Sequence, residues 1–152
     1  MKASRIILVA LVTYANKAHS QKAPVVLENS YVRYSISLDG RNLGFIDRAT
    51  GIDYLKHDTP SVCALVRRNT NEYPATSASF TDGRLIIRFE KAKAEAVIRI
   101  EPENSYIRLT VVSVTGEPID SLLFLNIPLT LKGQLSELFG ACAMSLNLIN
   151  SC

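Results

Sequence analysis

Apolar and polar residues alternate with a period of two along most of this chain beyond its first 20 residues. In residues 85–90, three apolar side chains share one parity: Leu85, Ile87 and Phe89. The same alternation recurs in three further segments, residues 31–38, 96–101 and 106–111. A β-strand directs successive side chains to opposite faces of its sheet, so this pattern is typical of antiparallel strands with one buried face. The pattern therefore predicts an all-β fold.

Irregularities in the alternation give more specific expectations. The parity changes at Val111 and Val112, which predicts a β-bulge or a strand that passes between two sheets. The longest single-parity set predicts a long strand and consists of Leu123, Leu125, Ile127, Leu129 and Leu131. Residues 134–148 are ambiguous, since their first half fits a helical turn and their second half a strand; we expect a strand there.

Turn signals separate the alternating segments. Asp39 with Gly40, residues 48–51 and Asp82 with Gly83 are hairpin signals, because glycine supplies the positive φ that tight turns need. Further turns are expected at residues 102–105 and 115–118. Spacings of about ten residues between such signals favour an antiparallel β-sandwich or barrel, and we expect a sandwich.

The first 20 residues have the three-part layout of a secretory signal peptide. Lys2 and Arg5 precede an apolar run at residues 6–12, and small side chains at Ala18 and Ser20 fit cleavage before Gln21. The run is shorter than the roughly 20 residues that a transmembrane helix needs. We expect a secreted or periplasmic protein, bacterial in origin, with one domain at residues 21–152.

Loss of the leader changes the charge of the chain. Three of the 17 basic residues lie in it, which leaves 14 basic residues against 14 acidic ones. A neutral domain lacks the concentrated positive charge that nucleic acids or anionic membranes attract, so neither is expected as a partner.

Three cysteines, Cys63, Cys142 and Cys152, lie beyond the leader. An odd number leaves at least one unpaired within a monomer. A disulfide between Cys63 and Cys142 is one interpretation, and burial of both as core residues is the other.

The residues that chemistry would need are sparse. His57 is the one histidine outside the leader, and no serine has the setting of a catalytic nucleophile, so we expect His57 to lie in an exposed polar loop. Metal-ligand spacings and glycine-rich phosphate loops are missing from the sequence, and the acidic residues fall on polar strand faces or in turns. The sequence thus predicts no catalytic residue, cofactor or metal, and the chain is not expected to be an enzyme.

Sugar binding has a candidate site in residues 67–74. Tyr73 offers an aromatic platform, and Arg67 and Arg68 offer hydrogen-bond donors beside it. The alternative is a surface loop with the tyrosine tucked beneath it.

Two segments carry a resemblance to a known group of domains. Residues 26–36 (VLENSYVRYSI) and residues 44–55 (GFIDRATGIDYL) resemble the opening hairpins of N-terminal β-sandwich domains in large bacterial carbohydrate-active enzymes. Those domains belong to the galactose-mutarotase-like supersandwich group, found in glycoside hydrolases and polysaccharide lyases. The resemblance implies a supersandwich-like fold beside a separate catalytic domain, and it transfers no catalytic residue to this chain.

Two functions follow as expectations. The first is a non-catalytic accessory domain of an exported carbohydrate-processing protein, which scaffolds that protein or binds a polysaccharide or oligosaccharide weakly. The second is a structural module without glycan binding that docks a protein partner. Because the chain ends directly after an apolar run, we also expect a sandwich truncated at its C-terminus, with an exposed sheet edge.

Overall fold

The computed structural model describes residues 23–134, 137 and 139–144. This part of the chain forms ten β-strands and one turn of 3-10 helix, and every strand pairing is antiparallel. The all-β prediction is therefore confirmed. The expected signal peptide and Cys152 lie outside the described residues.

One layer of the sandwich is a four-stranded sheet with the order β6-β7-β8-β9. Its strands are β6 (Ser77–Thr81), β7 (Arg84–Phe89), β8 (Ala94–Pro102) and β9 (Ile107–Gly116). Asp82 and Gly83, with φ of 51° and 71°, close the β6–β7 hairpin as the turn signal predicted. The short helix η1 (Glu90–Ala92) joins β7 to β8.

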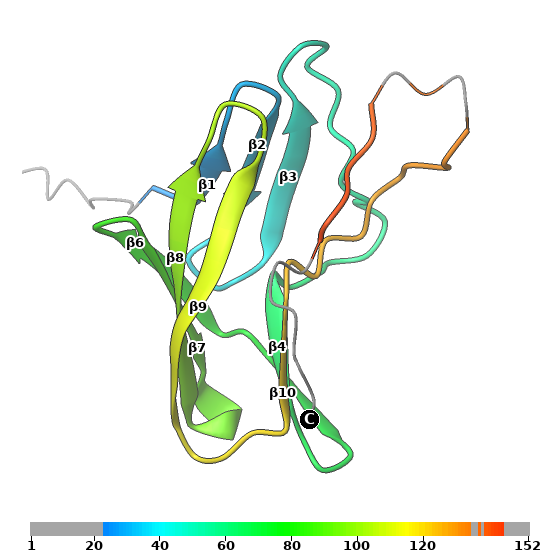
Figure 1. Ribbon diagram of the computed structural model, residues 1–152. Helices are drawn as coiled ribbons and strands as arrows, with labels where there is room; N and C mark the ends of the chain where they lie inside the picture. The colour runs from blue at the N-terminus through cyan, green and yellow to red at the C-terminus, as the bar shows by residue number, and fades with distance from the viewer. Residues whose placement is uncertain (1–22, 135–136, 138, 145–152) are drawn as a thin grey trace, which may run out of the picture.

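The other layer consists of two three-stranded sheets, one above the other in Figure 1. The upper sheet has the order β1-β2-β3, with β1 (Val25–Glu28), β2 (Val32–Ile36) and β3 (Asn42–Asp47). The lower sheet has the order β10-β4-β5, with β10 (Ser121–Phe124), β4 (Ala64–Arg68) and β5 (Asn71–Pro74). The long β8–β9 hairpin spans the height of both.

A single apolar core joins the layers. Leu85, Ile87 and Phe89 of β7 are buried on one face, as the alternation predicted. They belong to one cluster with the inner residues of β8, β4, β1 and β2, among them Ile98, Val66 and Ile36. Burial of such side chains contributes about 1.5–3 kcal/mol each to folding.

The parity change at Val111 and Val112 is a β-bulge. Ile98 pairs with Val111 and Val97 pairs with Ser113, so Val112 is the extra residue on β9. The predicted irregularity is therefore confirmed, in the first of its two expected forms.

The prediction of one long strand through residues 123–131 was wrong. β10 ends at Phe124, and Leu125 has a φ of 61°, which breaks the extended conformation. The parity is also reversed, because Leu122 and Phe124 pack against the core while Leu123 is 47% exposed.

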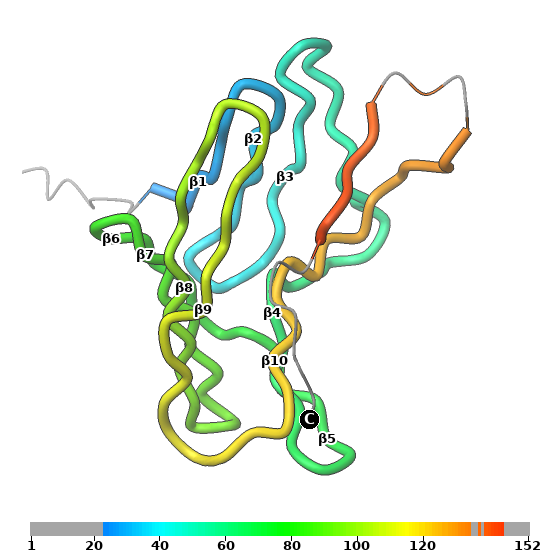
Figure 2. Tube along the Cα trace, viewed as in Figure 1, coloured from blue at the N-terminus to red at the C-terminus, as the bar shows by residue number. Residues whose placement is uncertain are grey.

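Residues 125–134 and 139–144 lie along the upper sheet without forming a strand and are drawn in orange and red in Figure 2. Leu129 forms an isolated bridge with Leu55, and the backbone N–H groups of Lys56 and Thr130 donate to the carbonyls of Pro128 and Tyr54, each at 2.8 Å. The strand expected in residues 134–148 is not found in the described part of that range; its other residues lie outside the description.

Candidate docking groove

An open groove of about 420 Å³ lies between the layers beside β9. Three parts of the chain line it: the β1–β2 hairpin with the neighbouring Phe45, the start of β9 with the turn before it, and the irregular segment after β10. Side chains that the argument below uses are Tyr31, Tyr106, Ile107, Leu109, Ile127 and Phe139.

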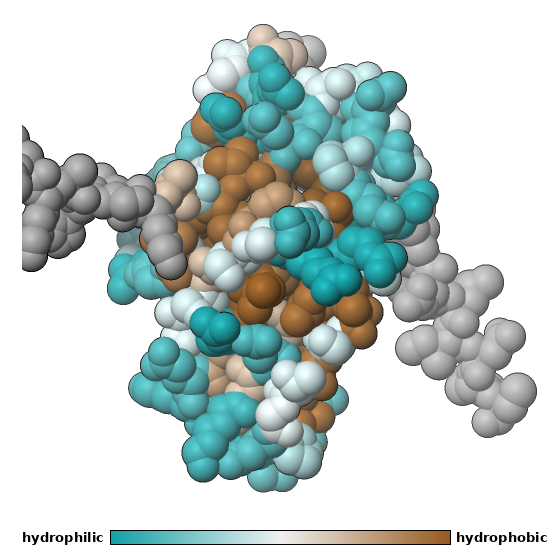
Figure 3. Space-filling view, turned by 90° about the vertical axis from the view of Figure 1, so that its left-hand side faces the viewer, coloured by the Kyte–Doolittle hydropathy of each residue, from teal (hydrophilic) through white to brown (hydrophobic). Residues whose placement is uncertain are grey.

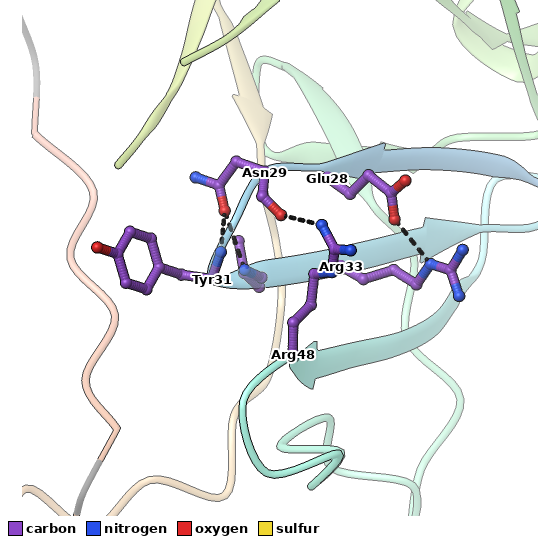
Figure 4. Close-up of polar contacts among 6 residues, drawn as sticks. Glu28, Asn29, Tyr31, Arg33 and Arg48 are labelled. Carbon is purple, nitrogen blue, oxygen red and sulfur yellow. Dashed lines mark hydrogen bonds and ion pairs between the residues drawn. The ribbon is translucent and has the colours of Figure 1, made fainter. Parts of the chain in front are cut away.

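The turn between β1 and β2 presents Tyr31 at the rim of the groove. The side-chain carbonyl of Asn29 accepts the N–H groups of Tyr31 and Val32, both at 2.9 Å, which is an Asx turn. The Arg48 guanidinium group donates to the backbone carbonyl of Asn29, and an ion pair of 3.0 Å joins Arg33 to Glu28 (Figure 4). The Tyr31 ring points away from this polar framework, and the residue is 58% exposed.

Tyr106 occupies an equivalent position at the tip of the β8–β9 hairpin. It follows the turn in which the Glu103 N–H donates to the Tyr106 carbonyl at 2.9 Å. A guanidinium nitrogen of Arg108 lies 3.1 Å from the Tyr106 hydroxyl, and the residue is 47% exposed. Two exposed tyrosines from two hairpin tips therefore border the same groove.

Aromatic packing holds the third wall in place. Phe139 stacks on Tyr54 with a centroid distance of 4.8 Å and an interplanar angle of 12°. It also meets Phe45 edge-on at 6.2 Å, and Phe45 lies 6.0 Å from Tyr34. Such contacts each add about 0.5–1.5 kcal/mol beyond area burial.

A buried polar network lies beneath the groove. The Tyr34 hydroxyl donates to the Asn42 side-chain carbonyl, and the Asn42 amide donates to Ser61 Oγ at 2.8 Å and to the Asn126 carbonyl at 2.9 Å. Burial, followed by the proximity of Cys63, raises the pKa of Tyr34, so its hydroxyl is a neutral donor. The network ties the segment after β10 to β3.

The groove is electrically neutral. None of its described lining residues is acidic or basic. Figure 3 shows apolar side chains gathered on one face of the molecule, with a polar band across them. The groove therefore suits a neutral, apolar occupant, because an unpaired charge there would lose its hydration.

The predicted glycan residues lie away from this groove and have other partners. Arg68 pairs with Glu117 at 2.7 Å and donates to the carbonyls of Pro118 and Ala92, while Arg67 pairs with Glu72 at 2.7 Å. The Arg68 guanidinium carbon also lies 5.9 Å from the centroid of the half-buried Tyr73 ring. These contacts tie β4 to β5 and to the β9–β10 connection, and glycan binding by the three residues stays a prediction.

His57 lies in an exposed loop, as expected. Its Nε2 is 3.1 Å from the Asp53 carboxylate, whose other oxygen accepts the N–H groups of Phe45 and Leu55 at 2.9 Å. Burial acts to raise the pKa of Asp53, but these hydrogen bonds outweigh it and hold the pKa below its usual value. The pair closes the loop after β3.

Cys63 and Cys142 are both free thiols in the structure, so the disulfide between them is not formed. Cys63 is buried in the core, and burial raises its pKa to about 12. Cys142 is exposed and lines the groove. The alternative of two core cysteines thus holds for Cys63 and fails for Cys142.

Within the described part of the chain, no three His, Cys, Asp or Glu side chains gather in a way that could hold a metal ion. Among the same residues, no helix is long and apolar enough to cross a membrane.

Comparisons with known proteins add no identity. No protein-family model, curated protein or solved structure matches this chain. The resemblance to supersandwich domains thus depends on residues 26–36 and 44–55, which form β2, most of β1 and β3, and the loop after β3. In that loop the Asp47 carboxylate accepts the Ala49 N–H at 3.0 Å and the Thr50 hydroxyl at 2.5 Å, so this part of the motif stabilises a turn.

Sequence reasoning missed the groove tyrosines and Phe139. Tyr31 and Tyr106 each follow a polar turn, and an aromatic residue at a hairpin tip was the available signal. Phe139 had none, because its partners Tyr54 and Phe45 are more than 80 residues away in sequence.

Proposed function

We propose that this chain is a non-catalytic accessory domain of an exported carbohydrate-processing protein and that it scaffolds that protein by docking a partner domain in the groove. The observation that carries the docking role is the groove itself: an open, neutral, apolar hollow of about 420 Å³ between the two layers. Exposed contiguous apolar surface rimmed by polar groups is typical of interaction sites. The carbohydrate context comes from the resemblance of the opening hairpins.

The rim has the composition of an interface centre. Tyr31 and Tyr106 expose aromatic rings at low conformational cost, and tyrosine is among the residues enriched in binding hot spots. Ile107, Leu109 and Ile127 pack against the core with one side and line the groove with the other. A partner that covers them gains apolar burial at about 25 cal/mol per Å².

The test starts from Cys142, which lines the groove. A photo-crosslinking maleimide is attached to Cys142 in a Cys152→Ser variant, in which the remaining cysteine, Cys63, is buried. Illumination in the host's exported fraction then crosslinks the protein that occupies the groove. The captured protein is then purified and titrated against three forms of the domain: wild type, the Tyr31→Asp/Tyr106→Asp double variant, and Phe80→Asp. Phe80 is the matched control, because it is 43% exposed on β6, the opposite edge of the sheet.

We expect the purified partner to be a carbohydrate-processing enzyme. Its affinity should fall at least about tenfold in the double variant, a loss of about 1.4 kcal/mol, and stay unchanged in Phe80→Asp. A partner that binds the double variant as well as wild type contradicts docking in the groove. A partner with no carbohydrate activity contradicts the accessory role.

Weak glycan binding is a second candidate at the same rim. Tyr31 and Tyr106 are exposed aromatic platforms with Asn29, Ser105 and Arg108 nearby, whereas the Tyr73 ring is half-buried with Arg68 over it. A glycan bound only by the folded domain stabilises it by about 2.7 kcal/mol at a hundredfold excess over Kd. A shift in Tm that Tyr31→Ala abolishes and Arg67→Ala leaves intact supports the rim site, while the reverse result supports the site at residues 67–74.

A further inference from the structure

We propose that the groove is filled by an added β-strand that pairs with residues 107–111 of β9: an extended, uncharged partner segment with apolar residues at every second position. This inference rests on the proposed function, since it specifies what occupies the same groove. Strand addition needs a free sheet edge, an uncovered apolar row beside it and a site without charge.

The main-chain groups of this part of β9 face outward. β9 is the last strand of its sheet, and among the described strands it pairs only with β8. The Ile100 N–H donates to the Gly83 carbonyl at 2.8 Å, so it points toward β7 and away from its pairing partner Leu109. Opposed residues in an antiparallel sheet exchange both hydrogen bonds or neither, so the N–H and C=O of Leu109 point to the free edge. The alternation gives the same direction at Ile107 and Val111.

Side chains on the inner face of β9 are exposed to solvent at positions where their partners on β8 are fully buried. Ile98 and Ala96 of β8 are 0% exposed, yet the residues paired with them, Val111 and Val114, are 44% and 40% exposed. Opposed residues point to the same face of a sheet, so both valines face the interior side of the sandwich. Side chains of an added strand would lie beside this row and enter the groove at Ile107 and Leu109.

The bulge at Val112 limits the length of the pairing. A bulge bends its strand and interrupts the ladder, which is one way in which proteins protect sheet edges. Residues 107–111 lie before the bulge and keep regular pairing with β8. The free edge next to the groove is therefore short. It offers three residues whose main-chain N–H and C=O groups are available for pairing.

The charge of the site selects the class of segment. The described lining contains no acidic or basic side chain. Arg108 is the one charged residue of β9; it is not among the lining residues, and its guanidinium group lies beside the Tyr106 hydroxyl at the rim. A buried charge from the partner would lack a counter-ion, so its inward positions are apolar. The backbone N–H and C=O groups of the partner segment then pair with those of Ile107, Leu109 and Val111.

The experiment uses the chain from residue 21 to 152 and a capped, fluorescently labelled peptide of alternating valine and threonine as the probe. Val111→Pro removes one edge-facing N–H without removing a bond to β8, while the matched Val111→Thr keeps that N–H and its branched shape. We expect the peptide to bind the wild-type domain and to slow amide hydrogen exchange at Ile107 and Leu109. Val111→Pro should weaken binding about five- to tenfold more than Val111→Thr.

Val111→Lys provides a second variant whose backbone N–H is intact, in case the proline variant does not fold. It places a charge beside the groove and should weaken binding as well. Absence of peptide binding, or binding with unchanged exchange at Ile107 and Leu109, overturns strand addition. Neither result affects the partner titration with the Tyr31→Asp/Tyr106→Asp variant, so the proposed function fails or stands separately.

Discussion

At the scale of single residues, one buried amide connects β3 with the segment after β10. Asn42 is 9% exposed and bonds to Tyr34, Ser61 and the backbone of Asn126, 84 positions further along. Asn126 in turn donates to the Val62 carbonyl at 3.2 Å. Because buried polar groups are costly when unpaired, this network fixes where the segment after β10 lies.

Replacement of Asn42 should therefore destabilise the domain strongly. Asn42→Ala leaves the Tyr34 hydroxyl buried without its acceptor and frees the Asn126 carbonyl, so we expect a loss of about 2–3 kcal/mol in the free energy of unfolding. Ser61→Ala removes one partner only and should cost about 1 kcal/mol. Urea unfolding of both variants measures the difference, and equal losses would contradict a central role for Asn42.

At the scale of elements, the end of β9 depends on a close backbone approach. Gly116 has a φ of 103°, and a Cβ atom there would lie 2.0 Å from the Lys93 carbonyl oxygen and 2.9 Å from Ala94 Cα. The contact lies between main chains, so no flexible side chain can move aside. Only glycine fits where β9 passes the start of β8.

Gly116→Ala should cost about 3 kcal/mol or more, the sum of backbone strain and overpacking. Gly51→Ala is the matched control, since Gly51 also has a positive φ, 75°, but has nothing within 4 Å of its would-be Cβ. We expect about 1–2 kcal/mol for that variant. Thermal or urea unfolding compares the two, and a control as costly as Gly116→Ala would show that steric contact plays no part.

At the scale of the whole molecule, carboxylates in turns make stability depend on pH. A hydrogen bond from Ser37 lowers the pKa of Asp39, and one from Thr50 lowers the pKa of Asp47, each below the usual 3.8. The pKa values of Asp53 and Asp58 are also lowered. The folded state therefore binds fewer protons than the unfolded state near pH 4.

Stability should consequently rise with pH through this window and be lost as pH falls through the lowered folded-state pKa values. We expect Tm to be constant between about pH 6 and 7 and to drop below about pH 4. Added salt should leave most of the drop in place, because hydrogen bonds rather than distant charges are the main cause at Asp39 and Asp47. Calorimetry across pH at two salt concentrations measures this; a Tm that rises on acidification would contradict the assignment.

The sequence by itself determined the local features of this protein. Alternation identified the buried faces of β7 and β8, the parity change located the bulge at Val112, and glycine positions located the turns, because each depends on neighbouring residues only. It also predicted an exposed loop at His57.

Only the tertiary structure decided how the segment after β10 lies and therefore that a groove exists. The positive φ of Leu125 ends the strand, although the alternation continues beyond it. Asn42 and Tyr54 form hydrogen bonds with residues of the following segment, which lie more than 70 positions away in sequence. The groove is formed by two hairpin tips and the segment after β10, which are distant from one another in sequence. No local sequence pattern predicts that they lie together. Pairing, burial and long-range hydrogen bonds between remote residues decide it, and these exist only once the layers have packed.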